Sequence, residues 1–579
     1  MRVGPVRPTG GAGRPGRPHG RRRRPLAVVV LVATAAALAG CATIPTSGPI
    51  GTGEVVVRQP GAPVPLAIAP EQDAPPEQIV GGFLRAVDAG IFDEFATARQ
   101  FLTFEASSDW DPRARTVVYE GGGPDIVRQE DGTVLLTVPV AATIDAGGRL
   151  AETPPETREE VAFELAQNPE GQWRISALED GVLLSSPTFE QFFRRTPVYF
   201  ATADLQYLVP DVRWFASRNQ ATAAVEALLA GPSPWLRDAV RTGVPDGARL
   251  STTAVTVDRG IAQVDLSVET RLASASERAL LQAQLDATLM RQQGVLVNEV
   301  QMLIAGAPVD PPTVPTLAVD PAPAEGPYVL VDGVLGLLER GEVTPLAGIG
   351  PLPPEADNPA LQPDGGVVAV RLGTSRVAVV PADGTGVVPV LTGTGLVPPS
   401  VDRFGWVWSA ERASGGLLVA ARADGTAVQV ELPWLMGRTV VALAVSADGA
   451  RVAVTSTGPE GPAVDVAEVA RLEDGTPRQS GEPLRLAPAL VDVGTVTWVD
   501  EVTLGVLGRT ESQAAATAHL VEVGGLTSAL PLVDGAVGLA AGRGERGLYV
   551  LSADGVLSVR QGQSWAVVAE GVQGVAFPR

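Results

Sequence analysis

The chain has 579 residues, of which 65 are acidic and 44 are basic, and its formal net charge is −21 at neutral pH. This length exceeds what one hydrophobic core can organise and predicts several domains. Acidic chains are repelled by nucleic-acid phosphates, so we expect no nucleic-acid partner. The only cysteine is Cys41 and the only histidines are His19 and His519, which excludes a disulfide within the chain and zinc sites of the His/Cys-cluster type.

The first 40 residues have the organisation of a secretory signal peptide. Eight arginines and no acidic residue precede an apolar run of 13 residues, positions 26–38. A membrane-spanning helix needs about 20 apolar residues, so this run is too short to persist as a span. The sequence Leu38-Ala39-Gly40-Cys41 resembles the lipobox of bacterial lipoproteins. This resemblance implies cleavage between Gly40 and Cys41 and lipidation of Cys41 as an S-diacylglycerol, N-palmitoyl cysteine. The pattern is compatible with both Sec and twin-arginine export.

Residues 41–76 are rich in Pro, Gly and Thr, which predicts an extended tether after the lipidated N-terminus. Apolar residues then recur at helical spacing from Ile79 to Val87, and Gly90 is expected to stop this helix. A second short helix is expected to carry Phe95, Ala98 and Leu102.

Strand-like runs follow at residues 116–119, 133–144, 160–165 and 173–178. Helices followed by a sheet predict an α+β domain over residues 77–195, an NTF2-like cone. Cone-shaped folds often enclose a pocket. We nevertheless expect Phe83, Phe101 and Trp110 to pack in the core of this domain.

A second α+β unit is predicted over residues 196–307. It is expected to open with strands at 198–200 and 208–210 and a helix at 221–230. A hairpin follows, with its turn at 258–260 and strand residues up to Val268. Ser274 and Glu277 are expected to begin a second helix as a capping box, Gly294 to end it, and residues 295–304 to form the last strand.

The region after residue 307 changes in composition. Residues 308–327 hold seven prolines and predict a semi-rigid linker. In residues 328–579, short Val/Leu-rich strands alternate with Asp-Gly turns, a strong hairpin signal. At about 40–45 residues per four-stranded blade, this region predicts a β-propeller of about six blades, with a pair of β-sandwiches as the alternative.

The sequence carries no recognisable catalytic motif. No serine lies in a GxSxG motif, and the GxGxxG matches at Gly11–Gly16 and Gly542–Gly547 lack the strand–turn–helix setting of a phosphate site. Paired carboxylates can hydrolyse glycosides, but no feature selects one pair among 65 acids. We therefore predict that the protein is not an enzyme, with no catalytic residue, metal site or cofactor, and we leave the ligand-binding residues unassigned.

Three stretches together resemble the actinobacterial lipoprotein LpqB family. The matching motifs are Ile79–Leu84 and Ala98–Thr103 for the LpqB N-terminal domain, Leu228–Pro232 and Val264–Ser267 for the GerMN domain, and Phe404–Trp408 and Val496–Trp498 for the propeller. The resemblance implies a protein held at the outer face of the cell membrane by lipid on Cys41. It also implies association with the extracytoplasmic domain of the sensor kinase MtrB, which acts with the regulator MtrA on cell-wall homeostasis and division.

Two functional hypotheses follow. The first is an accessory protein that binds and modulates the sensor kinase. The second is a module that binds cell-wall glycan or peptidoglycan through aromatic platforms. Trp406 and Trp408 alternate along one strand and would share a face, which suits a platform, although we favour packing between blades for both.

Overall fold

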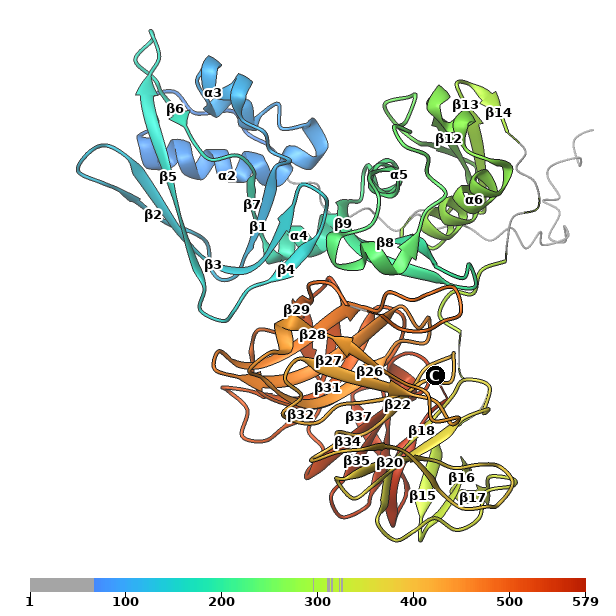
Figure 1. The fold of residues 1–579 in the computed structure, drawn as a ribbon. Coiled ribbons are helices and arrows are strands. Elements are labelled where there is room, and N and C mark those ends of the chain that lie inside the picture. The colour runs from blue at the N-terminus through green and yellow to red at the C-terminus, as the bar shows by residue number, and fades with distance from the viewer. Residues whose placement is uncertain are drawn as a thin grey trace, which may run out of the picture. The chain divides into compact units, whose positions relative to one another are not determined.

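The computed structural model describes residues 67–579 apart from 295, 310–312, 314–315, 322, 324–325, 479 and 579. The described chain contains two α+β regions followed by a β-rich region, coloured in that order from blue to red in Figure 1. These are the three fold types that the sequence predicts. The expectations for Gly40, Cys41 and the tether up to residue 66 lie outside the described residues.

In the first region a curved sheet covers the long helix α2 (Figure 1). The elements in chain order are α2 (Pro76–Asp93), a 3₁₀ helix (Ala98–Phe101), α3 (Phe104–Asp109), β1 (Arg115–Tyr119), β2 (Asp125–Arg128), β3 (Val134–Asp145), β4 (Leu150–Glu152), β5 (Arg158–Gln167), β6 (Trp173–Ala177), β7 (Val182–Ser185) and α4 (Ser186–Phe192). The sheet order is β6-β5-β3-β1-β7, with β2 and β4 also paired to β3.

Period-two patterning explains why one face of this sheet packs on α2. Buried and half-exposed residues alternate along nearly the whole length of β3, so that one face of this strand meets α2 while the other faces outward. Phe83, Phe101 and Trp110 are each 3% exposed and belong to one apolar cluster with residues of β3. The prediction that these three aromatic residues pack in the core is confirmed.

The prediction that Gly90 stops the first helix is wrong, because α2 continues to Asp93. Gly90 instead makes room for a ring: a Cβ atom placed there would lie 2.2 Å from Cδ1 of Phe95. The expected second helix is also shorter than predicted. Phe95 has a positive φ of 63°, which keeps it out of the 3₁₀ turn that begins at Ala98.

The second region contains two small sheets and two helices. Its elements are β8 (Phe193–Thr202), β9 (Leu208–Ala216), α5 (Gln220–Ala230), a 3₁₀ helix (Pro234–Ala239), β10 (Val240–Arg241), β11 (Thr256–Asp258), β12 (Ile261–Leu266), a 3₁₀ helix (Val268–Leu272), α6 (Ala275–Met290), β13 (Glu299–Ile304) and β14 (Ala307–Pro308). The sheet orders are β10-β8-β9 and β11-β12-β13-β14, and α6 connects the parallel strands β12 and β13.

The capping box is confirmed: Glu277 N–H donates to Ser274 Oγ, and Ser274 N–H donates to Glu277 Oε2. Three element limits differ from prediction. Helix α6 ends at Met290 instead of Gly294, Val268 lies in a 3₁₀ helix, and the last strand begins at Glu299. The two predicted strand limits followed the apolar pattern, and the predicted helix end followed Gly294, but the helix ends at Met290.

The proline-rich segment is only partly a spacer. Pro308 lies in β14, and Leu208 N–H donates to the carbonyl of Ala318. Leu317 and Val319 pack against the cluster that contains Tyr199. Described parts of this segment therefore lie along the second region's sheet.

Within the described residues, the last region forms six four-stranded sheets. Written from the innermost to the outermost strand, they are β38 (Val572–Ala576), β15 (Tyr328–Val331), β16 (Val334–Glu339), β17 (Glu342–Pro345); β18 (Ala356–Leu361), β19 (Val368–Leu372), β20 (Arg376–Val379), β21 (Val388–Thr392); β22 (Ser400–Val401), β23 (Val407–Ser409), β24 (Leu417–Ala421), β25 (Ala427–Glu431); β26 (Thr439–Val445), β27 (Arg451–Gly458), β28 (Gly461–Glu468), β29 (Leu484–Leu486); β30 (Leu490–Trp498), β31 (Thr503–Thr510), β32 (Thr517–Glu522), β33 (Thr527–Ala529); and β34 (Ala536–Ala541), β35 (Leu548–Ser552), β36 (Leu557–Gln561), β37 (Ser564–Ala569).

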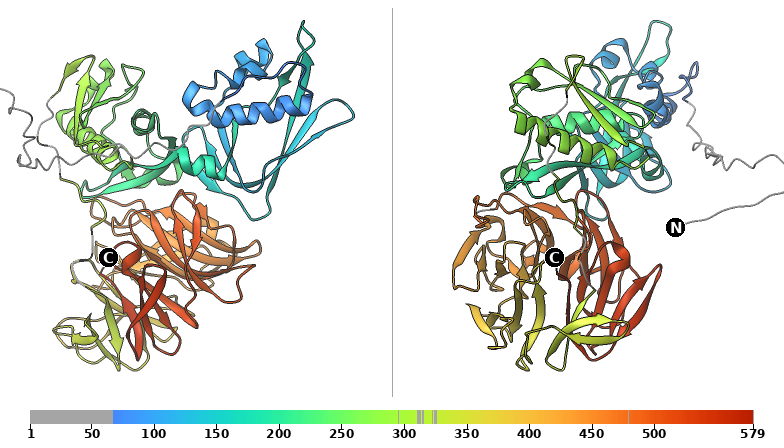
Figure 2. Two further views of the ribbon diagram at one scale, coloured as in Figure 1. Left: turned by 180° about the vertical axis from the view of Figure 1, so that it is seen from behind. Right: turned by 90° about the vertical axis from the view of Figure 1, so that its right-hand side faces the viewer.

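The six sheets are the blades of a closed propeller (Figure 2). Each innermost strand contacts the innermost strand of the next blade, and β38 completes the ring between β34 and β18. Strand β38 also pairs with β15, so the end of the chain completes the blade that the start of this region opens. The propeller prediction is confirmed, and the alternative of two β-sandwiches is wrong.

The Asp-Gly dipeptides form the turns that the sequence predicts. Residues 328–579 contain eight of them, and all eight glycines have φ between 66° and 89°, a region that residues with a Cβ atom rarely adopt. In several turns the aspartate accepts a hydrogen bond from the residue two positions later, as Asp424 does from Thr426 N–H.

Candidate functional site

The membrane is the first binding surface that the sequence predicts, but its residues, Gly40 and Cys41, are not described by the structure. In the described part of the chain, no helix combines the length and apolar character needed to cross a membrane. The same part contains no group of three or more His, Cys, Asp or Glu side chains placed to hold a metal ion.

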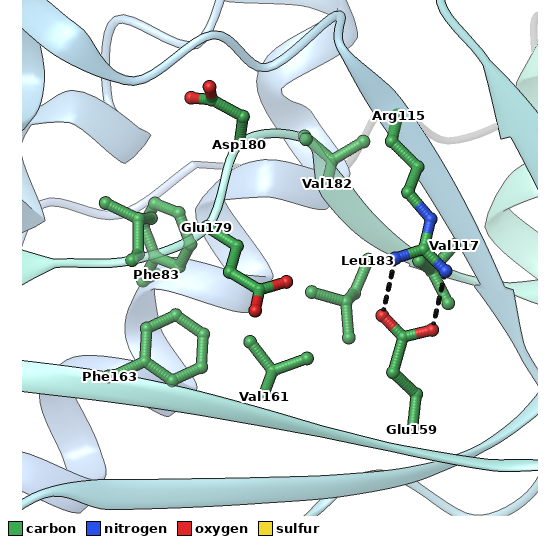
Figure 3. Close-up of a pocket in the computed structure, with 12 residues that line it drawn as sticks. Phe83, Arg115, Val117, Glu159, Val161, Phe163, Glu179, Asp180, Val182 and Leu183 are labelled. Carbon is green, nitrogen blue, oxygen red and sulfur yellow. Dashed lines mark hydrogen bonds and ion pairs between the residues drawn. The ribbon is translucent and has the colours of Figure 1, made fainter.

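A small hollow with a cavity volume of about 20 Å³ lies beside strands β1, β5 and β7 (Figure 3). Phe83, Val161 and Phe163 form its apolar floor, and Arg115 and Glu159 stand at its edge. The guanidinium of Arg115 donates two hydrogen bonds to the Glu159 carboxylate, at 2.9 and 2.7 Å. Both oxygens of Glu159 are therefore engaged.

The loop that borders this hollow is held by the core. The indole N–H of Trp110 donates to the carbonyl of Gly181, and Asp111 N–H donates to Asp180 Oδ1. Gly181 has φ +103°, and a Cβ atom there would lie 2.4 Å from the carbonyl oxygen of Arg115. Figure 3 shows the neighbouring Glu179 carboxylate turned toward the apolar floor.

Asp88 on α2 is a second candidate in this domain, one that sequence analysis missed. Burial raises the pKa of Asp88 to about 6, and a hydrogen bond with Thr188 opposes this rise. Burial and the charge of Asp88 in turn raise the pKa of Tyr119. Its helical position among apolar residues gave no signal, because one acid on a helix normally faces solvent.

The tryptophan platform is not available on the propeller. Trp406 and Trp408 are 1% and 0% exposed, and both belong to the apolar cluster between blades. The Trp408 indole N–H donates to Asp402 Oδ2, and the same carboxylate pairs with Arg471 at 2.7 Å. The prediction that these tryptophans pack between blades is confirmed, and they offer no surface for a glycan.

The centre of the propeller holds a channel with a cavity volume of about 140 Å³. Its lining comes from the innermost strands and from connections such as Pro398–Pro399, and no charged side chain is among the lining residues. The channel can solvate an uncharged ligand through backbone groups and the hydroxyls of Ser400, Thr495 and Thr497.

One face of the propeller contacts both α+β domains. Glu468 accepts hydrogen bonds from the N–H groups of Asp238 and Ala239, at 2.8 and 3.1 Å. Tyr199 donates its hydroxyl to Glu501 Oε1 at 2.7 Å. Further contacts at this face are Arg195 with Glu522, the Trp214 indole with the carbonyl of Gly524, Arg403 with Asp204, and Glu152 with Thr527.

Burial at this face raises the pKa of several carboxyl groups. It raises the pKa of Glu468 to about 7, against the opposing hydrogen bonds from Asp238 and Ala239, while the charge of Asp238 adds to the rise. Burial also raises the pKa of Glu152, Glu501 and Glu522. In the sequence, each of these acids has the local pattern of a surface residue, so sequence analysis did not identify them.

His519, the one histidine after residue 40, is buried in β32, and this burial lowers the pKa of its imidazole. The glycines of Gly542–Gly547 lie in the connection between β34 and β35, where no α-helix follows. Neither feature makes a catalytic or phosphate site.

These features define a class of protein in which a cone domain and a second α+β domain pack on one face of a six-bladed propeller. The candidate sites in the described residues are binding surfaces.

Three family models match the chain: the N-terminal domain of lipoprotein LpqB over residues 69–190, a sporulation and spore germination domain over 197–310, and the LpqB beta-propeller domain over 333–578. Lipoprotein LpqB of Thermobifida fusca is 30% identical over 583 residues, which cover 87% of this chain and 91% of that protein. The corresponding protein of Streptomyces coelicolor is 30% identical and covers 96% of this chain and 98% of its own length. The chain belongs to the LpqB lipoprotein family.

Proposed function

We propose that this protein is anchored by lipid on Cys41 at the outer face of the cytoplasmic membrane, where it binds the sensor kinase MtrB and modulates signalling to MtrA. The observation that carries this proposal is membership of a lipoprotein family along nearly the whole chain, together with the lipobox at Leu38–Cys41. Two acyl chains or more on Cys41 anchor a protein stably, because each buried CH₂ contributes roughly 0.8 kcal/mol.

The described sites fit a protein that acts by binding. A bound protein shifts a kinase between signalling states only if it binds one state more tightly than the other. The propeller channel is lined by uncharged side chains and backbone groups, which suits binding rather than acid–base chemistry. We therefore assign the protein no catalytic role.

The test is crosslinking in intact cells, followed by capture of the tagged protein and mass spectrometry. We expect recovery of the sensor kinase from wild type and its loss from Cys41→Ala, with deletion of the protein changing the phosphorylated fraction of MtrA. A matched control replaces residues 1–40 with another lipoprotein signal and keeps Cys41. If the wild-type protein recovers only wall polymer and wall enzymes, the kinase assignment fails and a cell-wall binding module takes its place.

A further inference from the structure

The propeller has two faces with different surroundings. Successive strands of a blade run antiparallel, so their connections alternate between the faces. The connections from a first to a second strand, and from a third to a fourth, lie on the face that meets the α+β domains; they include Arg403, Glu501 and Gly524. The remaining connections lie on the opposite face, which we call the open face.

The open face carries exposed apolar side chains at three consecutive blades. Met436, in the connection that leads to β26, is 69% exposed, and Val491, at the start of β30, is 38% exposed. Leu532 and Val537, which flank the start of β34, are both 53% exposed. Strands β26, β30 and β34 follow one another around the ring, and Thr495 Oγ1 donates to the carbonyl of Val537 across two of them.

The surroundings of these apolar side chains are acidic. Asp492 and Asp534 are exposed next to these apolar side chains, and the open-face connections between second and third strands of these blades and the preceding blade add the exposed acids Glu411, Glu460 and Glu511. None of the five forms a salt bridge within the described residues. Arg412 is exposed among them and Arg509 is half-buried, which leaves the surface net negative. Exposed apolar side chains with polar and charged neighbours are typical of a protein interface.

We propose that the open face at β26, β30 and β34 is the surface on which this protein binds its protein partner, and that the partner presents an apolar patch bordered by basic side chains. The inference rests on the proposed function, since it names the surface through which the kinase would be bound. Charge complementarity selects a basic partner over an anionic lipid surface or a nucleic acid, both of which the acids would repel.

The test places a photoreactive amino acid at position 436 or 532 of the full, lipid-anchored protein, with position 567 as the matched control. Val567 is 61% exposed, but it lies on β37, the outermost strand of its blade. We expect the kinase to crosslink from positions 436 and 532 and not from 567. We also expect Met436→Glu and Leu532→Glu each to weaken binding of the purified extracytoplasmic kinase domain at least tenfold, while Val567→Glu leaves it within twofold.

The outcomes separate the two proposals. Capture of the kinase by the wild-type protein, with no crosslink from 436 or 532 and no loss of binding in the glutamate variants, overturns the open-face inference and leaves the proposed function standing. Failure of the wild-type protein to capture the kinase by any route overturns both. Asp492→Asn with Asp534→Asn gives a second readout, because loss of these charges should weaken binding and reduce its dependence on salt concentration.

Discussion

At the scale of single residues, adjacent glycines in α2 have different roles. A Cβ atom on Gly82 would lie 2.5 Å from Cε1 of Phe101, a buried ring, whereas a Cβ atom on Gly81 finds its nearest atoms at 3.6 Å. The close approach of the 3₁₀ helix to α2 therefore requires glycine at position 82 but not at position 81.

This difference predicts that alanine is tolerated better at Gly81 than at Gly82. Both substitutions gain helix propensity of about 1 kcal/mol. Only Gly82→Ala also overpacks the core, at a cost of about 1–3 kcal/mol. We expect Gly82→Ala to be less stable than Gly81→Ala by about that cost, measured as the free energy of unfolding in urea. Equal stability of the two variants would contradict the close packing of Phe101.

At the scale of elements, the short strand β38 closes the ring of the propeller. Its five residues supply the innermost strand of one blade and the contact between β34 and β18. Without it, β15 presents an unpaired edge and the ring is open.

Truncation after Gly571 should therefore lower the thermal midpoint of the propeller and promote aggregation, measured by calorimetry and size-exclusion chromatography. The matched control is the truncated chain supplied with a synthetic peptide of residues 570–579, which should restore part of the lost stability. A truncated chain that melts at the wild-type temperature would show that the ring does not depend on this closure.

At the scale of the whole molecule, buried carboxyl groups connect the domains. The pKa of Glu468 is raised from 4.5 to about 7 in the folded protein, so folding favours its protonated form. Its stabilising contribution is therefore complete below pH 4.5 and is lost as the pH rises through about 7. The charges that face it are Asp238 and Arg237.

Glu468→Gln keeps an oxygen for the N–H groups of Asp238 and Ala239 but does not titrate. We expect the thermal midpoint of the wild-type protein to fall relative to this variant as the pH is raised from 5 to 8. The comparison is made between the two proteins because Glu152, Glu501 and Glu522 titrate in both. Glu460→Gln, at an exposed acid on the open face, should track the wild type at every pH. A constant difference between wild type and Glu468→Gln would contradict a buried, protonated Glu468.

The sequence by itself determined the features that depend on neighbours along the chain. These are the capping box of Ser274 and Glu277, the Asp-Gly turns and the three fold types, because apolar periodicity and turn chemistry act over a few residues. The signal peptide and the lipobox around Cys41 stay predictions from the sequence. Only the tertiary structure decided that the propeller ring is closed by β38 and that Glu468 and Glu501 meet another domain. These features depend on which distant surfaces pack together, and an acid has the same local pattern whether it faces water or a neighbouring domain.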